Sequence, residues 1–165
     1  MSKTEKNLKE AFAGESQANR KYLAFAKKAE EEGLPQIAKL FRAAAHAETI
    51  HALSHFKAMG GINSTKDNLM AAIEGETYEF QNMYPEFIAD AEKEEVKKAI
   101  TSFKWANDVE KVHAGLYKKA LENIEKGGVE VDYFVCPFCG YTHEGPYQGR
   151  CPVCNTLGEK FQKID

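Results

Sequence analysis

A Glu-x-x-His motif occurs twice in this 165-residue chain, and it constrains the fold more than any other feature. The first copy runs from Glu48 to His51 (ETIH), and the second runs from Glu110 to His113 (EKVH). On an α-helix, residues three apart lie on one face about one turn apart, so this carboxylate and imidazole can bind one metal ion together. The repeat therefore predicts two metal-binding half-sites on two helices.

Each motif is preceded by another glutamate at nearly the same distance along the chain. Glu15 precedes Glu48, and Glu76 precedes Glu110 at almost equal spacing. The chain thus reads as two helical hairpins, each with one Glu on its first helix and one Glu-x-x-His on its second. Four-helix bundles that direct such residues inward hold carboxylate-bridged di-iron or di-manganese sites. The sequence therefore predicts a four-helix bundle around two metal ions.

The predicted ligands lie beside or within the apolar stripes of these helices. Burial of an unpaired carboxylate is costly, and a pair of metal cations would neutralise several carboxylates at once. Oxygen-rich ligation with little imidazole favours iron or manganese over zinc. The candidate ligands of this site are Glu15, Glu48, His51, Glu76, Glu79, Glu110 and His113.

The two halves are not identical. Glu79 lies one turn after Glu76, whereas the first half has Ala18 at the matching place, so one metal has an additional candidate carboxylate. Tyr22 and Tyr84 follow the two upstream glutamates by about two turns. Each tyrosine could donate a hydrogen bond to a ligand carboxylate, or it could be an ordinary core residue.

Apolar periodicity and helix stop signals predict four long helices within residues 1–128. Thr4 is the expected cap of the first helix, and Ser64 lies in the expected cap of the third. We expect Gly75 to weaken the third helix and Pro85 to bend it. Residues 61–75 form either a short hairpin connection or a crossover of up to ~50 Å when extended. The expected helices run from about Glu5 to Gly33, Pro35 to Gly60, Lys66 to Ala91, and Glu94 to Lys126.

The last part of the chain has a different character. Residues 130–135 alternate in polarity and are rich in β-branched and aromatic side chains, which predicts a strand. We therefore expect two domains, a helical bundle over residues 1–128 and a small metal domain over residues 129–165. The aromatic residues of the small metal domain are expected either to surround the metal or to form the only core of that domain. They are Tyr133, Phe138, Tyr141, Tyr147 and Phe161.

Two Cys-x-x-Cys knuckles in this small domain predict a tetrahedral four-thiolate site. The small residues that follow them, Gly140 and Asn155, both tolerate the left-handed turn that such a knuckle needs. Zinc ribbons share the pattern, so the metal is either iron or zinc. Clustering of all four cysteines near the C-terminus favours a metal site over disulfides, and the ligands are Cys136, Cys139, Cys151 and Cys154.

Composition excludes several other classes of protein. The chain has a net charge of -3, 43% hydrophobic residues and a mean hydropathy of -0.52, with acidic and basic residues interspersed. No basic cluster predicts binding to nucleic acid or to an anionic membrane. The N-terminus is polar, and no apolar run approaches the ~20 residues that span a bilayer. We expect a cytoplasmic protein.

Together these motifs resemble the rubrerythrin family over essentially the whole chain. The segments that carry the resemblance are GESQANRKY, HAETIH, GETYEFQNMYPEF, VEKVH, CPFCG and CPVCN. The resemblance implies a ferritin-like di-iron bundle followed by a rubredoxin-like domain with one four-cysteine iron. Zinc or manganese are the expected substitutes. Asn155 and the C-terminal TLGEKFQKID depart from the usual pattern and would alter the four-cysteine iron's solvent access or potential.

The resemblance also implies roles for individual residues. Glu48 and Glu110 would bridge the two irons, and Glu76 and His113 would bind one of them. Glu15 and Glu79 would bind the other iron, and His51 would replace Glu79 on that iron in the reduced state.

The activity implied by the resemblance is reduction of hydrogen peroxide to water in defence against oxidative stress. Electrons would pass through the four-cysteine iron from a donor such as rubredoxin and its NAD(P)H-dependent reductase. The assembly would be a homodimer or larger. The alternatives are a ferritin-like ferroxidase or iron store, a di-iron protein that reduces dioxygen, and a structural zinc ribbon on an inert bundle.

Overall fold

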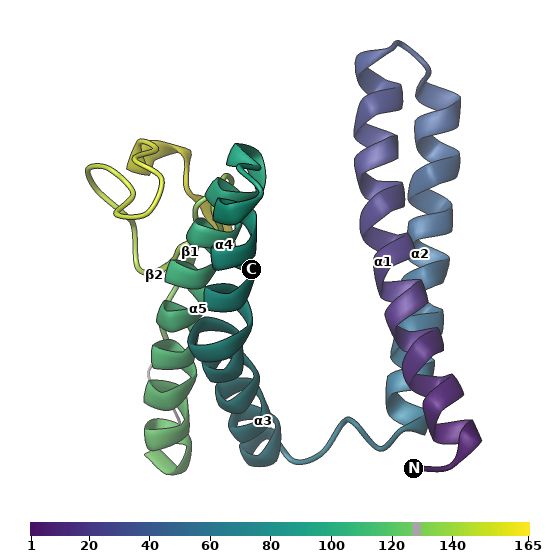
Figure 1. The fold of residues 1–165 in the computed structure, drawn as a ribbon, viewed down its shortest axis with the longest axis horizontal. Coiled ribbons are helices and arrows are strands. Elements are labelled where there is room, and N and C mark those ends of the chain that lie inside the picture. The colour runs from purple at the N-terminus through teal and green to yellow at the C-terminus, as the bar shows by residue number, and fades with distance from the viewer. Residues whose placement is uncertain (127–129) are drawn as a thin grey trace. The chain divides into compact units, whose positions relative to one another are not determined.

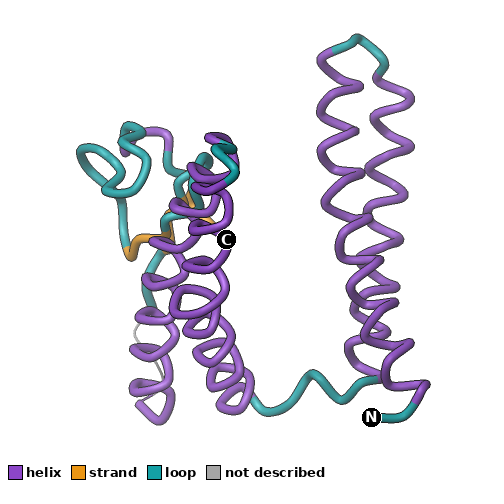
Figure 2. Tube along the Cα trace, viewed as in Figure 1, coloured by secondary structure: helices purple, strands orange, loops and turns teal. Residues whose placement is uncertain are grey.

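The computed structural model describes residues 1–126 and 130–165. It contains two compact units, Met1–Asn63 and Ser64–Asp165. Helices make up nearly all of residues 1–126, and short strands occur only after residue 130 in the described chain (Figure 2). The predicted fold class, mainly α with a small β- and loop-rich C-terminal region, is confirmed. The predicted domain boundary at residues 128–129 lies outside the described residues.

The first unit is a hairpin of two antiparallel helices, α1 (Lys3–Glu31) and α2 (Pro35–Ala58) (Figure 1). The predicted cap Thr4 is wrong, because Ser2 caps α1 instead. The Ser2 hydroxyl accepts a hydrogen bond from the Glu5 amide at 3.1 Å, and the Glu5 carboxylate accepts one from the Ser2 amide. This reciprocal pair satisfies two backbone donors at the helix start. Gly33 ends the turn after α1 at a φ of 72°, as its lack of a side chain allows.

Small side chains form the seam between α1 and α2. Because alanine projects little beyond the backbone, the two helices can approach closely. The buried residues of this unit are Ala26, Ala29, Ala38, Ala45 and Ala52. Large apolar side chains of the same hairpin are exposed, and they include Leu23, Phe25, Ile37, Leu40, Ile50 and Leu53. Exposed apolar surface of this extent marks a surface that contacts another element or protein.

The second unit begins with one long helical segment made of α3 (Thr65–Tyr78), a π-helical turn (Glu79–Met83) and α4 (Tyr84–Lys93). The predicted cap is confirmed, because the Ser64 hydroxyl accepts from the Asp67 amide at 3.2 Å. Residues 65–75 are therefore helical, and only residues 59–64 connect α2 to α3. The fifteen-residue extended segment considered for residues 61–75 does not form, because α3 begins at Thr65.

The irregular turn of this segment lies at Glu79–Met83 rather than at Gly75, where weakness was predicted. The Tyr84 amide donates to the Glu79 carbonyl five residues earlier, which defines the π-helical turn. Pro85 follows directly and has no amide hydrogen to donate to the carbonyl of Gln81. Such π turns are frequent at functional sites. This one carries Glu79, the carboxylate that the first half of the chain lacks.

Helix α5 (Lys97–Asn123) packs against α3 and α4 and ends in a 3₁₀ turn (Ile124–Lys126) (Figure 1). It begins later than the predicted start at Glu94, because Glu95 adopts a left-handed conformation with φ 58° and breaks the helix there. The predicted stop at Gly127-Gly128 falls outside the described residues.

The C-terminal region forms a three-stranded antiparallel sheet. Strand β1 (Tyr133–Val135) lies between β2 (Thr142–Glu144) and β3 (Gln162–Ile164), so only the second half of the predicted strand is formed. Cys136, Cys151 and Phe161 are buried in its core. Tyr141 and Tyr147 pack there as predicted, whereas Phe138 is 60% exposed at the tip of its knuckle and does not join the core.

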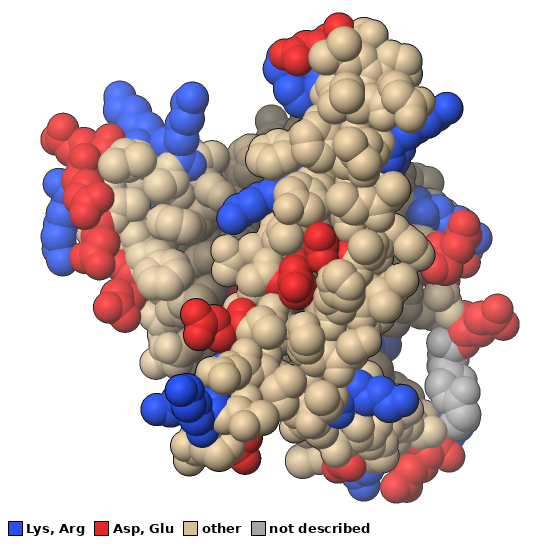
Figure 3. Space-filling view, turned by 90° about the vertical axis from the view of Figure 1, so that its right-hand side faces the viewer, with Lys and Arg blue, Asp and Glu red and all other residues tan. Residues whose placement is uncertain are grey.

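No described helix combines the length and apolar composition needed to cross a bilayer. On the face that Figure 3 displays, Lys and Arg side chains alternate with Asp and Glu and do not merge into one basic area. The absence of a basic cluster on that face agrees with the charge pattern of the sequence.

Candidate metal centres

The first predicted half-site forms on the α1–α2 hairpin. Glu15 on α1 meets Glu48 and His51 on α2, and one donor atom from each lies within 4.8 Å of the others. His51 Nδ1 is 2.8 Å from Glu48 Oε2 and 4.0 Å from Glu15 Oε1. One turn after Glu15, the Asn19 amide donates to the Ala45 carbonyl at 2.7 Å and holds α1 against α2 beside this cluster.

The second half-site has almost the same geometry on different helices. Glu76 on α3 meets Glu110 and His113 on α5, again with one donor atom of each within 4.8 Å. His113 Nδ1 is 2.8 Å from Glu110 Oε2 and 3.9 Å from Glu76 Oε1. The two sequence repeats therefore build the same three-residue arrangement twice. The two histidines differ in solvent exposure: the His51 side chain is 54% exposed, and the His113 side chain is 25% exposed.

The carboxylates of the second unit repel one another. Burial raises the pKa of Glu76, and the nearby Glu110 carboxylate raises it further. Burial and Glu110 likewise raise the pKa of Glu79, which lies outside the group of donor atoms within 4.8 Å. A metal cation would relieve this repulsion. Carboxylate oxygens with one imidazole per half-site suit iron or manganese, so the residues fit the predicted metal.

Two tyrosines lie near the second half-site. Burial raises the pKa of Tyr84, and the Glu79 carboxylate adds to that effect, which puts this predicted tyrosine close to the carboxylates. Sequence reasoning missed Tyr117, whose pKa is raised by burial and then by Glu76. Its spacing of four residues from His113 places it on the same face of α5 and could have identified it. Both hydroxyls stay protonated at neutral pH and can donate hydrogen bonds.

Tyr22 has a different environment. Its ring lies 6.3 Å from that of Phe25 and 6.2 Å from that of Phe41, measured between ring centroids. Within the described residues its hydroxyl forms no hydrogen bond to a carboxylate. Packing is therefore the only role that these contacts give it.

The four cysteines come together in the small domain as free thiols. Cys136 Sγ lies 3.5 Å from Cys154 Sγ, and Cys139 Sγ lies 3.5 Å from Cys151 Sγ. A disulfide would bring two sulfurs to about 2.05 Å, so these spacings are those of separate ligands around one ion.

The knuckle backbone adopts the predicted turns. Gly140 has φ 84° and its amide donates to the Cys136 carbonyl at 3.0 Å. Asn155 has φ 65° and its amide donates to the Cys151 carbonyl at 2.9 Å. Asparagine therefore takes the left-handed position that glycine takes in the other knuckle, as predicted.

The thiols do not share one electrostatic environment. Burial raises the pKa of Cys139 and of Cys151. Burial also acts on Cys154, but hydrogen bonds with the Thr156 hydroxyl and amide and with the Cys136 and Cys139 sulfurs outweigh it and lower the pKa of Cys154 to about 7. A bound cation is what allows all four sulfurs to be thiolates together.

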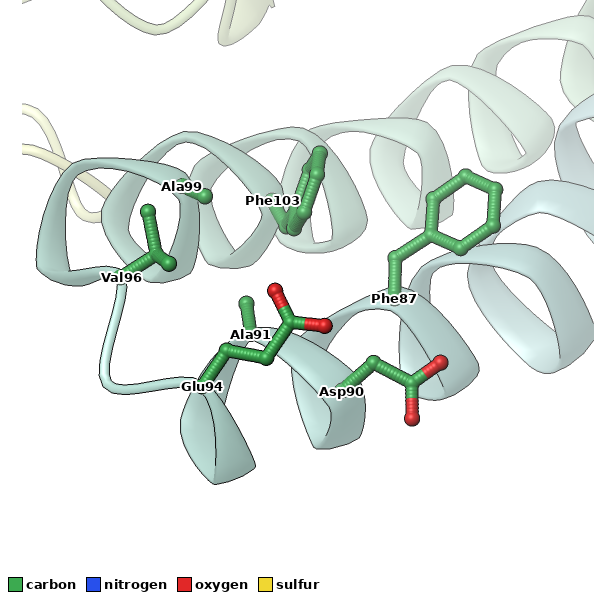
Figure 4. A pocket seen from close by; sticks show the side chains of 7 residues that line it. All are labelled: Phe87, Asp90, Ala91, Glu94, Val96, Ala99 and Phe103. Atoms are coloured by element: carbon green, nitrogen blue, oxygen red, sulfur yellow. The ribbon is translucent and has the colours of Figure 1, made fainter.

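Two of the cavities in the second unit are similar in size. One of about 360 Å³ lies between α4 and α5 and contains none of the predicted ligands (Figure 4). It is lined by Phe87, Asp90, Ala91, Glu94, Val96, Ala99 and Phe103. The other, of about 310 Å³, is bordered by His113, Tyr117, Tyr133 and Thr142, where α5 meets the small sheet. Of these two cavities, the second alone touches a candidate ligand.

Comparison with known proteins places these features in context. Residues 6–121 match the family model described as Rubrerythrin. Rubrerythrin-2 of Clostridium acetobutylicum is 34% identical over 94% of this chain and 93% of its own length. Nigerythrin of Nitratidesulfovibrio vulgaris is 39% identical over 92% of this chain and 81% of its own. A solved structure described as the fully reduced, all-ferrous state of nigerythrin superposes with a TM-score of 0.60 at 36% identity, covering 99% of this chain and 88% of that one.

Proposed function

The chain belongs to the rubrerythrin family, and on that premise we propose that it reduces hydrogen peroxide to water in defence against oxidative stress. Members of the family are oxidoreductases with a di-iron carboxylate and histidine site and a four-cysteine site, so iron is the cofactor of both. The observation that carries the proposal is that one Glu and one Glu-x-x-His motif come together twice in the chain, which also brings four cysteines together.

We propose that the residues of these half-sites are the ligands of the two irons. Glu48 and Glu110, the carboxylates closest to their own histidines, would bridge the metals. Glu76 and His113 would be the remaining protein ligands of one iron. The other would be bound by Glu15 and Glu79, with His51 taking the place of Glu79 in the reduced state.

The bound irons would supply the two electrons that cleave the O–O bond, in the balance H₂O₂ + 2e⁻ + 2H⁺ → 2H₂O. The protein residues would hold and orient the reactants. Glu110 and Glu76 hold His113 with Nδ1 directed into the cluster. The protonated hydroxyls of Tyr84 and Tyr117 would donate hydrogen bonds there, since their raised pKa values keep them neutral.

The four cysteines would hold the iron through which electrons return one at a time from an external carrier. A rubredoxin-type protein and its NAD(P)H-dependent reductase are the proposed donors. The tetrahedral set of cysteines suits such a role, because it leaves no open position for chemistry and changes little with oxidation state.

We also propose that the functional assembly is a homodimer. The resemblance of the chain to the rubrerythrin family supports it. Light scattering on the iron-loaded protein should give twice the 18.5 kDa mass of one chain. A mass of one chain would contradict the dimer, and a cage-sized particle would favour iron storage.

The peroxidase proposal is tested by comparing two oxidants. The anaerobically reduced, iron-loaded protein is mixed with hydrogen peroxide or with dioxygen in a stopped-flow instrument. We expect faster reoxidation by peroxide, with two electrons consumed per molecule. Faster reoxidation by dioxygen would contradict the proposal and favour an oxidase.

A further inference from the structure

The two cysteine knuckles share a backbone hydrogen bond but differ in the residue that precedes them. In each knuckle the amide of the first cysteine donates to the carbonyl five residues later, at 2.9 Å in the first knuckle and 2.7 Å in the second. The residue before that cysteine is Val135 in the first knuckle and Arg150 in the second. The second knuckle therefore has a cation at the place where the first has an apolar side chain.

The Arg150 side chain is bonded across the second knuckle. Its Nη1 donates to the Asn155 carbonyl at 3.1 Å. Arg150 directly precedes Cys151, and Asn155 directly follows Cys154. The Arg150 carbonyl in turn accepts a hydrogen bond from the Tyr147 hydroxyl at 3.2 Å. The guanidinium is thus tied to both ends of the loop that carries two of the four thiols.

The positive charge of Arg150 is not neutralised by a carboxylate. Among the residues that the structure describes, Arg150 forms no ion pair, whereas Lys163 Nζ lies 2.9 Å from Asp132 Oδ1 and Lys119 pairs with Glu144. A guanidinium also keeps its charge at any pH at which proteins fold. The second knuckle therefore carries a permanent cation without a counter-charge from the described chain.

Reduction of a four-cysteine iron by one electron makes the site more negative. Four thiolates with ferric iron carry one net negative charge, and the same thiolates with ferrous iron carry two. A neighbouring cation attracts the more negative form more strongly, which favours the ferrous state. Charge and hydrogen bonding around the sulfurs are among the factors that set the reduction potential of such sites.

We propose that Arg150 raises the reduction potential of the four-cysteine iron through its positive charge, so that this iron takes electrons more favourably from the carrier protein. The inference rests on the proposed function, in which a one-electron carrier reduces this iron from ferric to ferrous. The carrier loses the one electron that the iron gains. Arg150 is not among the metal-binding candidates, so it acts on the potential and not as a ligand.

The test compares three substitutions of Arg150 with the original protein, each as the full iron-loaded chain. Arg150→Lys keeps the charge, Arg150→Gln removes the charge but keeps an N–H donor, and Arg150→Met removes both. Lys98→Gln is the control for loss of one cation elsewhere, because Lys98 is exposed near the start of α5. The readout is the midpoint potential of the four-cysteine iron, measured by spectroelectrochemical titration without peroxide.

We expect Arg150→Gln and Arg150→Met to lower the potential, so that the equilibrium constant for reduction by a given carrier falls about 3- to 10-fold. A tenfold change corresponds to about 59 mV for one electron. Arg150→Lys and Lys98→Gln should keep the original potential. The difference between Arg150→Gln and the original protein should shrink at high ionic strength, because Arg150 is exposed and salt screens its charge.

Equal potentials in Arg150→Gln and the original protein would overturn the inference. A fall in Arg150→Met alone would overturn it too, because the hydrogen bond to Asn155 and not the charge would then set the potential. Failure of the reduced original protein to react with peroxide would instead contradict the proposed function. The potentials are measured without peroxide, so they decide the role of Arg150 in that case as well.

Discussion

Replacement Glu110→Ala should abolish iron binding in the carboxylate site and reduce peroxide turnover by about 10³-fold. Glu110 contacts His113 at 2.8 Å and is the carboxylate that acts on Glu76, Glu79 and Tyr84 alike. It is also the proposed bridge between the irons. Loss of a metal centre removes several kcal/mol of transition-state stabilisation, and about 1.4 kcal/mol corresponds to a tenfold change in rate. The measurements are iron content per chain and anaerobic peroxide turnover.

The matched control for this prediction is Glu122→Ala. Glu122 lies on the same helix with an exposed side chain, so the same change there tests only the effect on α5 itself. Its iron content and turnover should equal those of the original protein. In Glu110→Ala the four-cysteine iron should keep its colour, since none of its ligands lies on α5. Full turnover in Glu110→Ala would show that the carboxylate site is assigned wrongly.

The second large effect is expected from Cys139→Ser. Three thiolates and a hydroxyl hold a soft metal poorly, so the small domain should lose its iron and much of its fold. Burial of Cys136 and Cys151 in the core of this small sheet makes the fold depend on the metal. We expect turnover driven by a carrier protein to fall about 100-fold or more, since metal-dependent small domains unfold without their ion. The di-iron centre should still react once with peroxide after chemical reduction.

Phe138→Ser is the control in the same knuckle, because Phe138 is mostly exposed and lies outside the core that holds the ligand sulfurs. It should retain the iron spectrum and donor-driven turnover. Unchanged donor-driven turnover in Cys139→Ser would contradict the proposed electron route. Loss of the single reaction with peroxide in Cys139→Ser would show instead that the two sites depend on each other for folding.

The features that sequence predicted well are those set by local geometry. Glu48 and His51 are three residues apart, so the helical repeat alone places them on the same face. The knuckle conformations at Gly140 and Asn155 follow from the ability of these two residue types to adopt a positive φ. The pairing of Glu15 with Glu48 needed only a hairpin with a short turn. These predictions required no knowledge of distant contacts.

The features that sequence missed depend on competition between neighbours or on tertiary contact. The π turn that carries Glu79 arises where Pro85 removes a backbone donor, and sequence showed only that a bend was expected. Thr142 meets His113 across a separation of 29 residues, so no local pattern could reveal that hydrogen bond. Phe138 was predicted either to surround the metal or to form part of the core, but its side chain is exposed.

We propose that this chain holds a carboxylate di-iron centre, which peroxide oxidises, and one four-cysteine iron. Mössbauer spectroscopy of ⁵⁷Fe-loaded protein tests it most directly, because the two kinds of iron have separate signals. We predict two irons with oxygen and nitrogen ligands for every iron with sulfur ligands. One equivalent of peroxide should convert the reduced pair from ferrous to ferric. Zinc in the four-cysteine site with no iron at the carboxylates, or a ferrous pair that peroxide leaves unchanged, would contradict the claim.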